Sequence, residues 1–214
     1  GQRAAPCVPP PTDSRRTYPE VQRLCGRLLS YHSPMTGPRS TGKADSTRTD
    51  AESALERLEL GPFATNCYIY APQPPACWII DAGMGPEALI ARVRALELTP
   101  EKLILTHAHL DHIAGVDAVS RAFPGIELLI HEAERDWLTD ADLNLSGGYG
   151  FPVTCRPADR LLTDGDGLTI AGETWRVLHT PALSPGGITL HNADRGVAFV
   201  GDTLFAGSIG RHDF

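Results

Sequence analysis

From residue 55 onward the sequence predicts a layered α/β domain, and three observations carry this prediction. Short β-rich runs alternate with segments whose apolar residues recur at helical spacing, which is typical of strands packed under helices. Some neighbouring β-rich runs are separated only by turn-forming residues, as in β-hairpins. No segment repeats at the period of a solenoid. We therefore expect sheets with helices layered against them.

The elements follow one another in a clear order. In the first helical segment, Leu89, Val93 and Leu96 share one face, and Pro86 suits its first turn. Residues 139–160 are rich in Gly, Pro and Asp and predict a loop. The predicted strand segments are 55–60, 66–70, 77–81, 102–106, 126–131, 168–179, 187–191 and 197–201. The predicted helices are 85–96, 113–123 and 132–138.

The first 53 residues differ in composition from the rest, since they are rich in Pro, Ser, Thr, Gly and Arg. Such a segment buries too little apolar surface to order itself, so we expect residues 1–53 to be a disordered leader before a domain at 55–214. A transit peptide is the alternative, but the frequent Pro opposes the amphipathic helix of such peptides. The absence of an initial Met is expected of a processed or partial chain.

Composition and charge exclude several classes of protein. Residues 55–214 contain eleven Lys or Arg against twenty-one Asp or Glu, so this acidic domain offers no electrostatic footprint for nucleic acid. No apolar run approaches the roughly 18 residues of a membrane helix. The five cysteines are scattered and include no C-x-x-C pair. We therefore expect reduced thiols in a cytoplasmic protein with no membrane partner.

The heptapeptide THAHLDH at residues 106–112 crowds three histidines and an aspartate together. His107 and His109 follow a predicted strand, and their spacing of two places them on one side of an extended chain. Asp111 and His112 begin the next helix. Strand ends of this kind are the usual place for a ligand crevice in α/β proteins. Imidazole and carboxylate are ligands for Zn²⁺, Mn²⁺ or Fe²⁺, so the sequence predicts a metal centre here.

The heptapeptide resembles the H-x-H-x-D-H signature of the metallo-β-lactamase-fold hydrolases. Further segments resemble this family in the same order: IIDAG at 79–83, VLHTPALSPGG at 177–187, VGDTLF at 200–205 and GSIGRHDF at 207–214. The last of them resembles a segment of the branch that contains the glyoxalase II-like hydroxyacylglutathione hydrolases and the persulfide-dioxygenase-like enzymes. The resemblance covers residues 55–214 and implies an αββα four-layer sandwich with its site at one edge.

The resemblance also implies roles for individual residues. His107 and His109 would hold a first metal, Asp111 and His112 a second, and Asp202 would bridge them. Two zinc ions are expected, with Fe or Mn as alternatives, and metal-bound hydroxide would cleave a thioester or similar acyl bond. Asp111 is also our candidate catalytic residue. Arg211 would bind the carboxylate of a small substrate such as a glutathione thioester. Asp81 would orient the ligands, or would be a simple turn residue.

Two features depart from the family pattern. Leu183 stands where the third segment of the family has a histidine ligand, and leucine has no lone pair for a metal. His179 is about 13 Å of extended chain away and is a poor substitute. The chain also ends at Phe214, before the family's final helix and strand, so we expect a C-terminally incomplete fold that lacks one histidine ligand of the second metal.

Four functions remain open at this point. The first is a metal-dependent hydrolase resembling hydroxyacylglutathione hydrolase. The second is an enzyme resembling the persulfide dioxygenases, with one iron. A lactamase or lactonase is the third. The fourth is a degenerate domain that keeps the fold without catalysis, which Leu183 favours directly.

Overall fold

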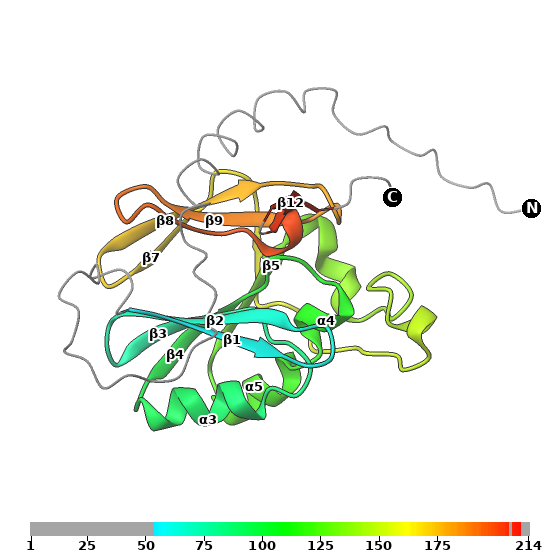
Figure 1. Cartoon of the computed structure of the whole chain (residues 1–214), viewed down its shortest axis with the longest axis horizontal. Helices are drawn as coiled ribbons and strands as arrows, with labels where there is room; N and C mark the ends of the chain where they lie inside the picture. The colour runs from blue at the N-terminus through cyan, green and yellow to red at the C-terminus, as the bar shows by residue number, and fades with distance from the viewer. Residues whose placement is uncertain (1–53, 206, 211–214) are drawn as a thin grey trace, which may run out of the picture. The chain divides into compact units, whose positions relative to one another are not determined.

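The computed structural model describes residues 54–205 and 207–210, in which two main sheets face each other (Figure 1). The expected leader at 1–53 and Arg211 lie outside the described residues. Among the described residues, none of the helices has the length and apolar character that spanning a bilayer requires. The layered α/β class predicted from the sequence is confirmed.

The first sheet contains six strands that are hydrogen-bonded in chain order. They are β1 (Leu55–Leu60), β2 (Thr65–Gln73), β3 (Ala76–Ile80), β4 (Thr99–Ile104), β5 (Glu127–His131) and β6 (Arg160–Leu162). The pairs β1–β2 and β2–β3 are antiparallel, whereas β3 to β6 are parallel. Parallel neighbours need crossover connections, and these contain most of the helices.

The second sheet is an antiparallel meander with the order β10-β9-β8-β7. Its strands are β7 (Gly167–Ile170), β8 (Glu173–His179), β9 (Ile188–Asn192) and β10 (Val197–Phe199), so the predicted strand region at 168–179 is a hairpin. β11 (Leu204–Phe205) and β12 (Ser208–Ile209) form a separate two-stranded sheet. The two main sheets are joined beyond the end of β4, because the Ile188 amide donates to the Thr106 carbonyl oxygen at 2.9 Å.

The helices α3 (Glu87–Ala95) and α5 (Val116–Ala122) lie on the outer face of the first sheet, opposite the second sheet (Figure 1). In α3, Pro86 precedes Glu87 in the first turn and arginines occupy the last turn, an arrangement that complements the helix dipole. The remaining helices are α4 (Leu110–Ile113) and the 3₁₀ segments η2 (Glu132–Leu138), η3 (Gly147–Tyr149) and η4 (Gly201–Thr203).

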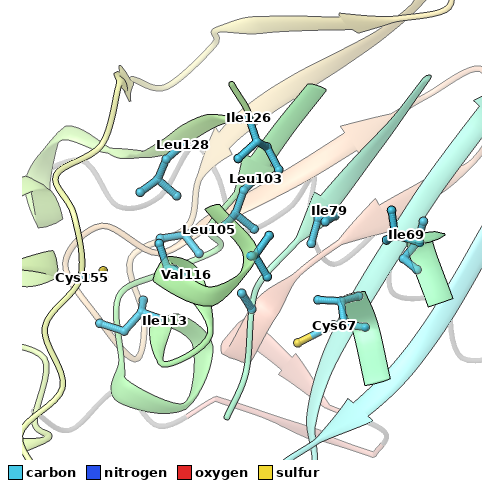
Figure 2. Packing of buried hydrophobic residues seen from close by; sticks show 14 of the residues in the cluster. Cys67, Ile69, Ile79, Leu103, Leu105, Ile113, Val116, Ile126, Leu128 and Cys155 are labelled. Carbon is cyan, nitrogen blue, oxygen red and sulfur yellow. The ribbon is translucent and has the colours of Figure 1, made fainter. Parts of the chain in front are cut away.

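Two apolar cores hold these layers together. One lies between the first sheet and the helices and includes Ile79, Leu103, Ile113 and Val116 (Figure 2). The other lies between the two sheets and is largely aromatic. Its members Tyr70, Trp78, Trp175 and Phe199 have ring centroids 4.9 to 6.3 Å apart in successive contacts. Each fully buried large side chain contributes roughly 1.5–3 kcal/mol, so these rings anchor the second sheet.

Three local predictions need correction. The single helix predicted at 113–123 is two helices, α4 and α5, because the Gly115 amide donates to the Ala82 carbonyl oxygen at 2.8 Å instead of continuing the helical ladder. A Cβ on Gly115 would lie 2.6 Å from the Gly83 carbonyl oxygen, so only glycine fits there. The segment 132–138 is 3₁₀ and kinked at Glu134. The strand β6 was missed, since three residues are too few to show a period.

Candidate metal centre

Three of the five residues predicted as metal ligands, His107, His112 and Asp202, form one close group at an edge of the sandwich, and His109 and Asp111 lie beside it without belonging to the group. His107 and His109 lie between β4 and α4, and His112 lies on α4. Asp202 comes from η4, which follows β10 of the second sheet. Ligand atoms of His107, His112 and Asp202 all lie within 4.8 Å of one another. Residues almost a hundred positions apart are therefore close enough to share one coordination sphere.

Asp81 holds Thr106 and His112 in place through its carboxylate. Its buried carboxylate accepts hydrogen bonds from the Thr106 amide and the Thr106 hydroxyl, both at 2.7 Å. The His112 Nδ1 lies 2.8 Å from the same carboxylate. Asp81 has a φ of +59°, a left-handed conformation that Asp tolerates better than most residues. These contacts orient the His112 ring and the Thr106 hydroxyl, as the orienting role open for Asp81 requires.

The hydrogen bonds of Thr106 determine the tautomer of His107. The single Thr106 hydroxyl proton goes to Asp81, so this hydroxyl must accept from the His107 Nδ1–H at 3.2 Å. The other ring nitrogen, Nε2, then carries a lone pair. This Nε2 is buried and has no hydrogen-bond partner among the described residues. An orphaned lone pair beside other ligand groups is what a metal centre requires.

His112 is oriented in the same way, with Nδ1 on Asp81 and Nε2 toward two further carboxylates. The distances from Nε2 are 3.5 Å to Asp111 and 3.4 Å to Asp202. Burial lowers the pKa of His112, but the attraction of Asp81, Asp202 and Asp111 outweighs it and raises this pKa to about 10. Without metal, a proton on His112 therefore balances part of the negative charge of the cluster.

His107 and His109 behave in the opposite way. Burial lowers the pKa of His107 well below its usual value, and His112 and His109 lower it further. Burial also lowers the pKa of His109, against the opposing attraction of Asp111. The two rings lie edge to face with centroids 4.8 Å apart, and Trp137 lies 5.8 Å from His109. Neutral imidazoles are the form that binds a metal.

Asp111 and Asp202 are the more accessible members, with side chains that are 22% and 27% exposed. The Thr65 hydroxyl donates to Asp111 at 2.7 Å and fixes its carboxylate. Asp202 depends on Gly201, whose φ is +50°. A Cβ on Gly201 would lie 2.6 Å from the Thr106 hydroxyl oxygen, so glycine lets η4 approach β4 closely.

Leu183 lies beside the candidate ligands, at the position where the family pattern has a histidine ligand. Together with His107, Asp202 and Thr180 it lines a cavity of about 10 Å³, which is about the space of one water molecule. Its apolar side chain is half-buried there and offers no donor to a metal. The described ligand group thus has an apolar wall where a histidine is expected.

His179 does not replace the missing ligand. Its Nε2 donates to the Pro185 carbonyl oxygen at 2.8 Å, and its ring stacks on His131 with centroids 4.1 Å apart. Neither ring belongs to the metal-ligand group found among the described residues. His179 instead braces the loop that carries Leu183, and the ring of His131 packs against the ring of His179.

Two polar residues of this region were missed from the sequence. Thr65 lies at the start of an ordinary strand, and Glu134 lies in a charged segment typical of a solvent-exposed helix. Glu134 is nevertheless fully buried. Neither residue belongs to a recognisable motif, so no local signal distinguishes it from its neighbours.

Comparisons with known proteins agree with this geometry. The family model described as the metallo-beta-lactamase superfamily matches residues 60–214. A probable metallo-hydrolase of Bacillus subtilis, YqgX, is 38% identical over 159 residues, which are 73% of this chain and 74% of that protein. The hydroxyacylglutathione hydrolase GloC of Haemophilus influenzae is 32% identical over 162 residues, covering 75% of this chain and 76% of GloC.

Solved structures show the same fold. The BLEG-1 B3 metallo-beta-lactamase is 43% identical with a TM-score of 0.70, and the match covers 74% of this chain and 77% of that one. A di-iron-bound form of TTHA1623 is 31% identical with a TM-score of 0.63 and the same coverage. The two facing sheets with their helical layer are therefore a metallo-β-lactamase fold.

Proposed function

This chain belongs to the metallo-β-lactamase superfamily, and from this premise we propose that it is a metal-dependent hydrolase that cleaves a thioester or similar acyl bond. One observation carries the proposal. The buried Nε2 of His107 has a lone pair and, within the part of the chain that the structure describes, no hydrogen-bond partner, and ligand atoms of His112 and Asp202 lie within 4.8 Å of it. A cation is the partner that satisfies such a group.

The donor set fits a divalent metal. His107 and His109 would hold a first ion, Asp111 and His112 a second, and Asp202 would contribute to both. Zn²⁺ is the expected metal, because it takes imidazole and carboxylate ligands. TTHA1623 binds two irons on a similar fold, so iron is the alternative. Leu183 withholds one ligand from the first ion, so that ion would be held more weakly.

When bound, the metal would activate water for attack on an acyl carbon and stabilise the charge on the carbonyl oxygen. The protein groups would prepare this step. Asp81 keeps the imidazole of His112 turned toward the cluster, and Thr106 does the same for His107. Asp111 is held by Thr65 and partly exposed, so it is suited to accept a proton from water.

The thioester preference rests on the similarity to GloC. The test is hydrolysis of S-D-lactoylglutathione by the Zn²⁺-loaded full chain, with His107→Ala as the inactive control. Thiol release that depends on Zn²⁺ and on His107 is the expected result. Metal binding without thiol release would leave the superfamily membership intact and would overturn the thioester assignment.

A lactamase is the second candidate, favoured by the 43% identity to BLEG-1. Hydrolysis of the chromogenic β-lactam nitrocefin in the same preparations separates the two functions. A chain that binds one iron and consumes O₂ with glutathione persulfide would indicate the dioxygenase alternative. A chain that binds no metal would indicate the degenerate domain. We further propose a cytoplasmic enzyme whose partner is a small-molecule substrate.

A further inference from the structure

Glu134 is a buried carboxylate that lies behind the metal centre and joins two segments distant in sequence. Its side chain is 0% exposed. One carboxylate oxygen accepts from the Ala108 amide at 2.6 Å, and the other accepts from the Gly186 amide at 2.7 Å. Each carboxylate oxygen thus accepts from one backbone N–H group that secondary structure leaves unpaired.

Both of these segments border the proposed metal centre. Ala108 stands between His107 and His109, so its amide belongs to the backbone that carries the first pair of ligands. Gly186 closes the loop whose Leu183 and Ser184 line the cavity beside His107 and Asp202. A group that holds these two amides holds the two walls of the first metal position together.

We propose that Glu134 is a positioning residue that sets the distance between the His107–His109 segment and the 180–187 loop, and thereby the affinity of the first metal position. This inference rests on the proposed metal-dependent function. It assigns a role to a residue that lies outside the ligand set.

The chemistry of the site requires a carboxylate. Burial raises the pKa of the Glu134 carboxyl, while the hydrogen bonds from the Gly186 and Ala108 amides act in the opposite direction. Two N–H donors need two acceptor oxygens, and glutamine has only one. In Glu134→Gln, an NH₂ group would face a backbone N–H and push one segment away.

Gly186 is matched to Glu134 from the other side. A Cβ added to Gly186 would lie 2.7 Å from the Cγ of Glu134 and 2.9 Å from its Cδ. Gly186→Ala should therefore displace the loop from Glu134 while the Ala108 hydrogen bond remains. The two hydrogen bonds from Ala108 and Gly186 to Glu134 are called the clamp below. This second variant perturbs the clamp without altering the buried charge.

A purely structural role gives a different expectation. The two sheets are also joined by the hydrogen bond from the Ile188 amide to the Thr106 carbonyl oxygen, which does not involve Glu134. A folded Glu134→Gln protein should keep this connection and lose only the clamp. A positioning role therefore changes metal affinity and metal geometry in the folded protein, whereas a structural role changes stability alone.

The experiment compares the full chain with Glu134→Gln, Gly186→Ala and the matched control Glu132→Gln, whose acid is exposed and two residues away. Zn²⁺ affinity is measured by competition with a chromophoric chelator, and the visible spectrum of the Co²⁺-loaded protein reports ligand geometry. We expect both clamp variants to weaken Zn²⁺ binding about 10-fold or more and to alter the Co²⁺ bands. The control should match the parent.

The outcomes separate this inference from the proposed function. A parent chain that binds neither Zn²⁺ nor Co²⁺ would overturn both. A parent that binds, with folded clamp variants that bind equally well and give the parent spectrum, would overturn the Glu134 role alone. If Glu134→Gln does not fold, Gly186→Ala decides between the two roles by the same measurements.

Discussion

The carboxylate of Asp81 lies 2.8 Å from the Nδ1 of His112, and both side chains are almost completely buried, at 1% and 4% exposure. This contact leaves the Nε2 of His112 facing Asp111 and Asp202. It also explains why an aspartate is needed at a backbone position with positive φ. Asp81 therefore orients the cluster of candidate ligands without belonging to it.

Asp81→Asn should disturb metal binding more than it disturbs the fold. Asn tolerates positive φ and can still accept from the Thr106 amide, but its NH₂ favours a lone pair on the His112 Nδ1. The His112 proton would then move to Nε2, where a metal is expected. We predict a loss of Zn²⁺ affinity of about 10–100-fold and of stability of about 1–3 kcal/mol.

Competition titration and urea unfolding measure these two effects, and histidine ¹⁵N shifts report the tautomer. Asp136→Asn is the control, since the Asp136 side chain is 82% exposed. Unchanged Zn²⁺ affinity in Asp81→Asn would show that Asp81 does not orient His112.

The stability of the metal-free protein should fall as the pH rises from about 7.5 to about 8.5. The pKa of His112 is raised from its usual 6.5 to about 10 in the folded protein. Its contribution to the free energy of unfolding is therefore complete below pH 6.5 and is lost as the pH rises toward the pKa of the folded state. The buried cysteines also make stability fall as the pH rises, but only above their usual pKa of 9.0. The reason is that burial raises the pKa of Cys67 to about 12. Below about pH 7.5 the lowered pKa values of His107 and His109 act in the opposite direction, because these rings take up protons only in the unfolded chain. The interval from about pH 7.5 to 8.5 therefore reports mainly His112.

Urea unfolding in the presence of a chelator measures this slope. Asp81→Asn should flatten it, since the residue that most strongly attracts the His112 proton is gone. A free energy of unfolding that rises across the interval would contradict the assignment of a charged His112.

Gly201→Ala should destabilise the protein and displace Asp202. Gly201 and Gly196 both have positive φ, at +50° and +66°, but only Gly201 has a close neighbour, the Thr106 hydroxyl. Gly196→Ala should therefore cost only the left-handed conformation, roughly 1–2 kcal/mol. Gly201→Ala should cost about 1–3 kcal/mol more from overpacking and should also weaken Zn²⁺ binding. Equal losses of stability in the two variants would show that η4 moves enough to accept the added methyl group at no further cost.

Much of the fold follows from local patterns, because strands and helices differ in apolar period. β4 was predicted from its short apolar run, whereas β6 was missed because its three residues are too few to show a period. The break at Gly115 depends on a contact with the Asp81–Gly83 turn that no local pattern encodes.

The candidate site divides in the same way. His107, His112 and Asp202 stand in motifs, and the structure brings them together as the sequence predicts. Their roles as ligands stay predictions. Glu134 was missed because only the tertiary fold buries it. Arg211 lies outside the described residues, so its role as a substrate ligand also stays a prediction.

The last prediction concerns Leu183, which lines the cavity beside His107 and Asp202. A catalytic zinc usually has three protein ligands and a water, and here a leucine side chain stands in a ligand direction. An apolar group disfavours a hydrated cation beside it. Leu183→His should therefore strengthen Zn²⁺ binding at the first position by at least about 10-fold, since even residues behind the ligands change affinity by that much.

Leu183→Ala is the matched control, because it removes the leucine without adding a donor. Stoichiometry and affinity are measured by competition titration on metal-free protein, with Co²⁺ spectra to show a third nitrogen ligand. If the chain with Leu183 already holds two tightly bound zinc ions, the argument from Leu183 is wrong, and another group must complete the first position.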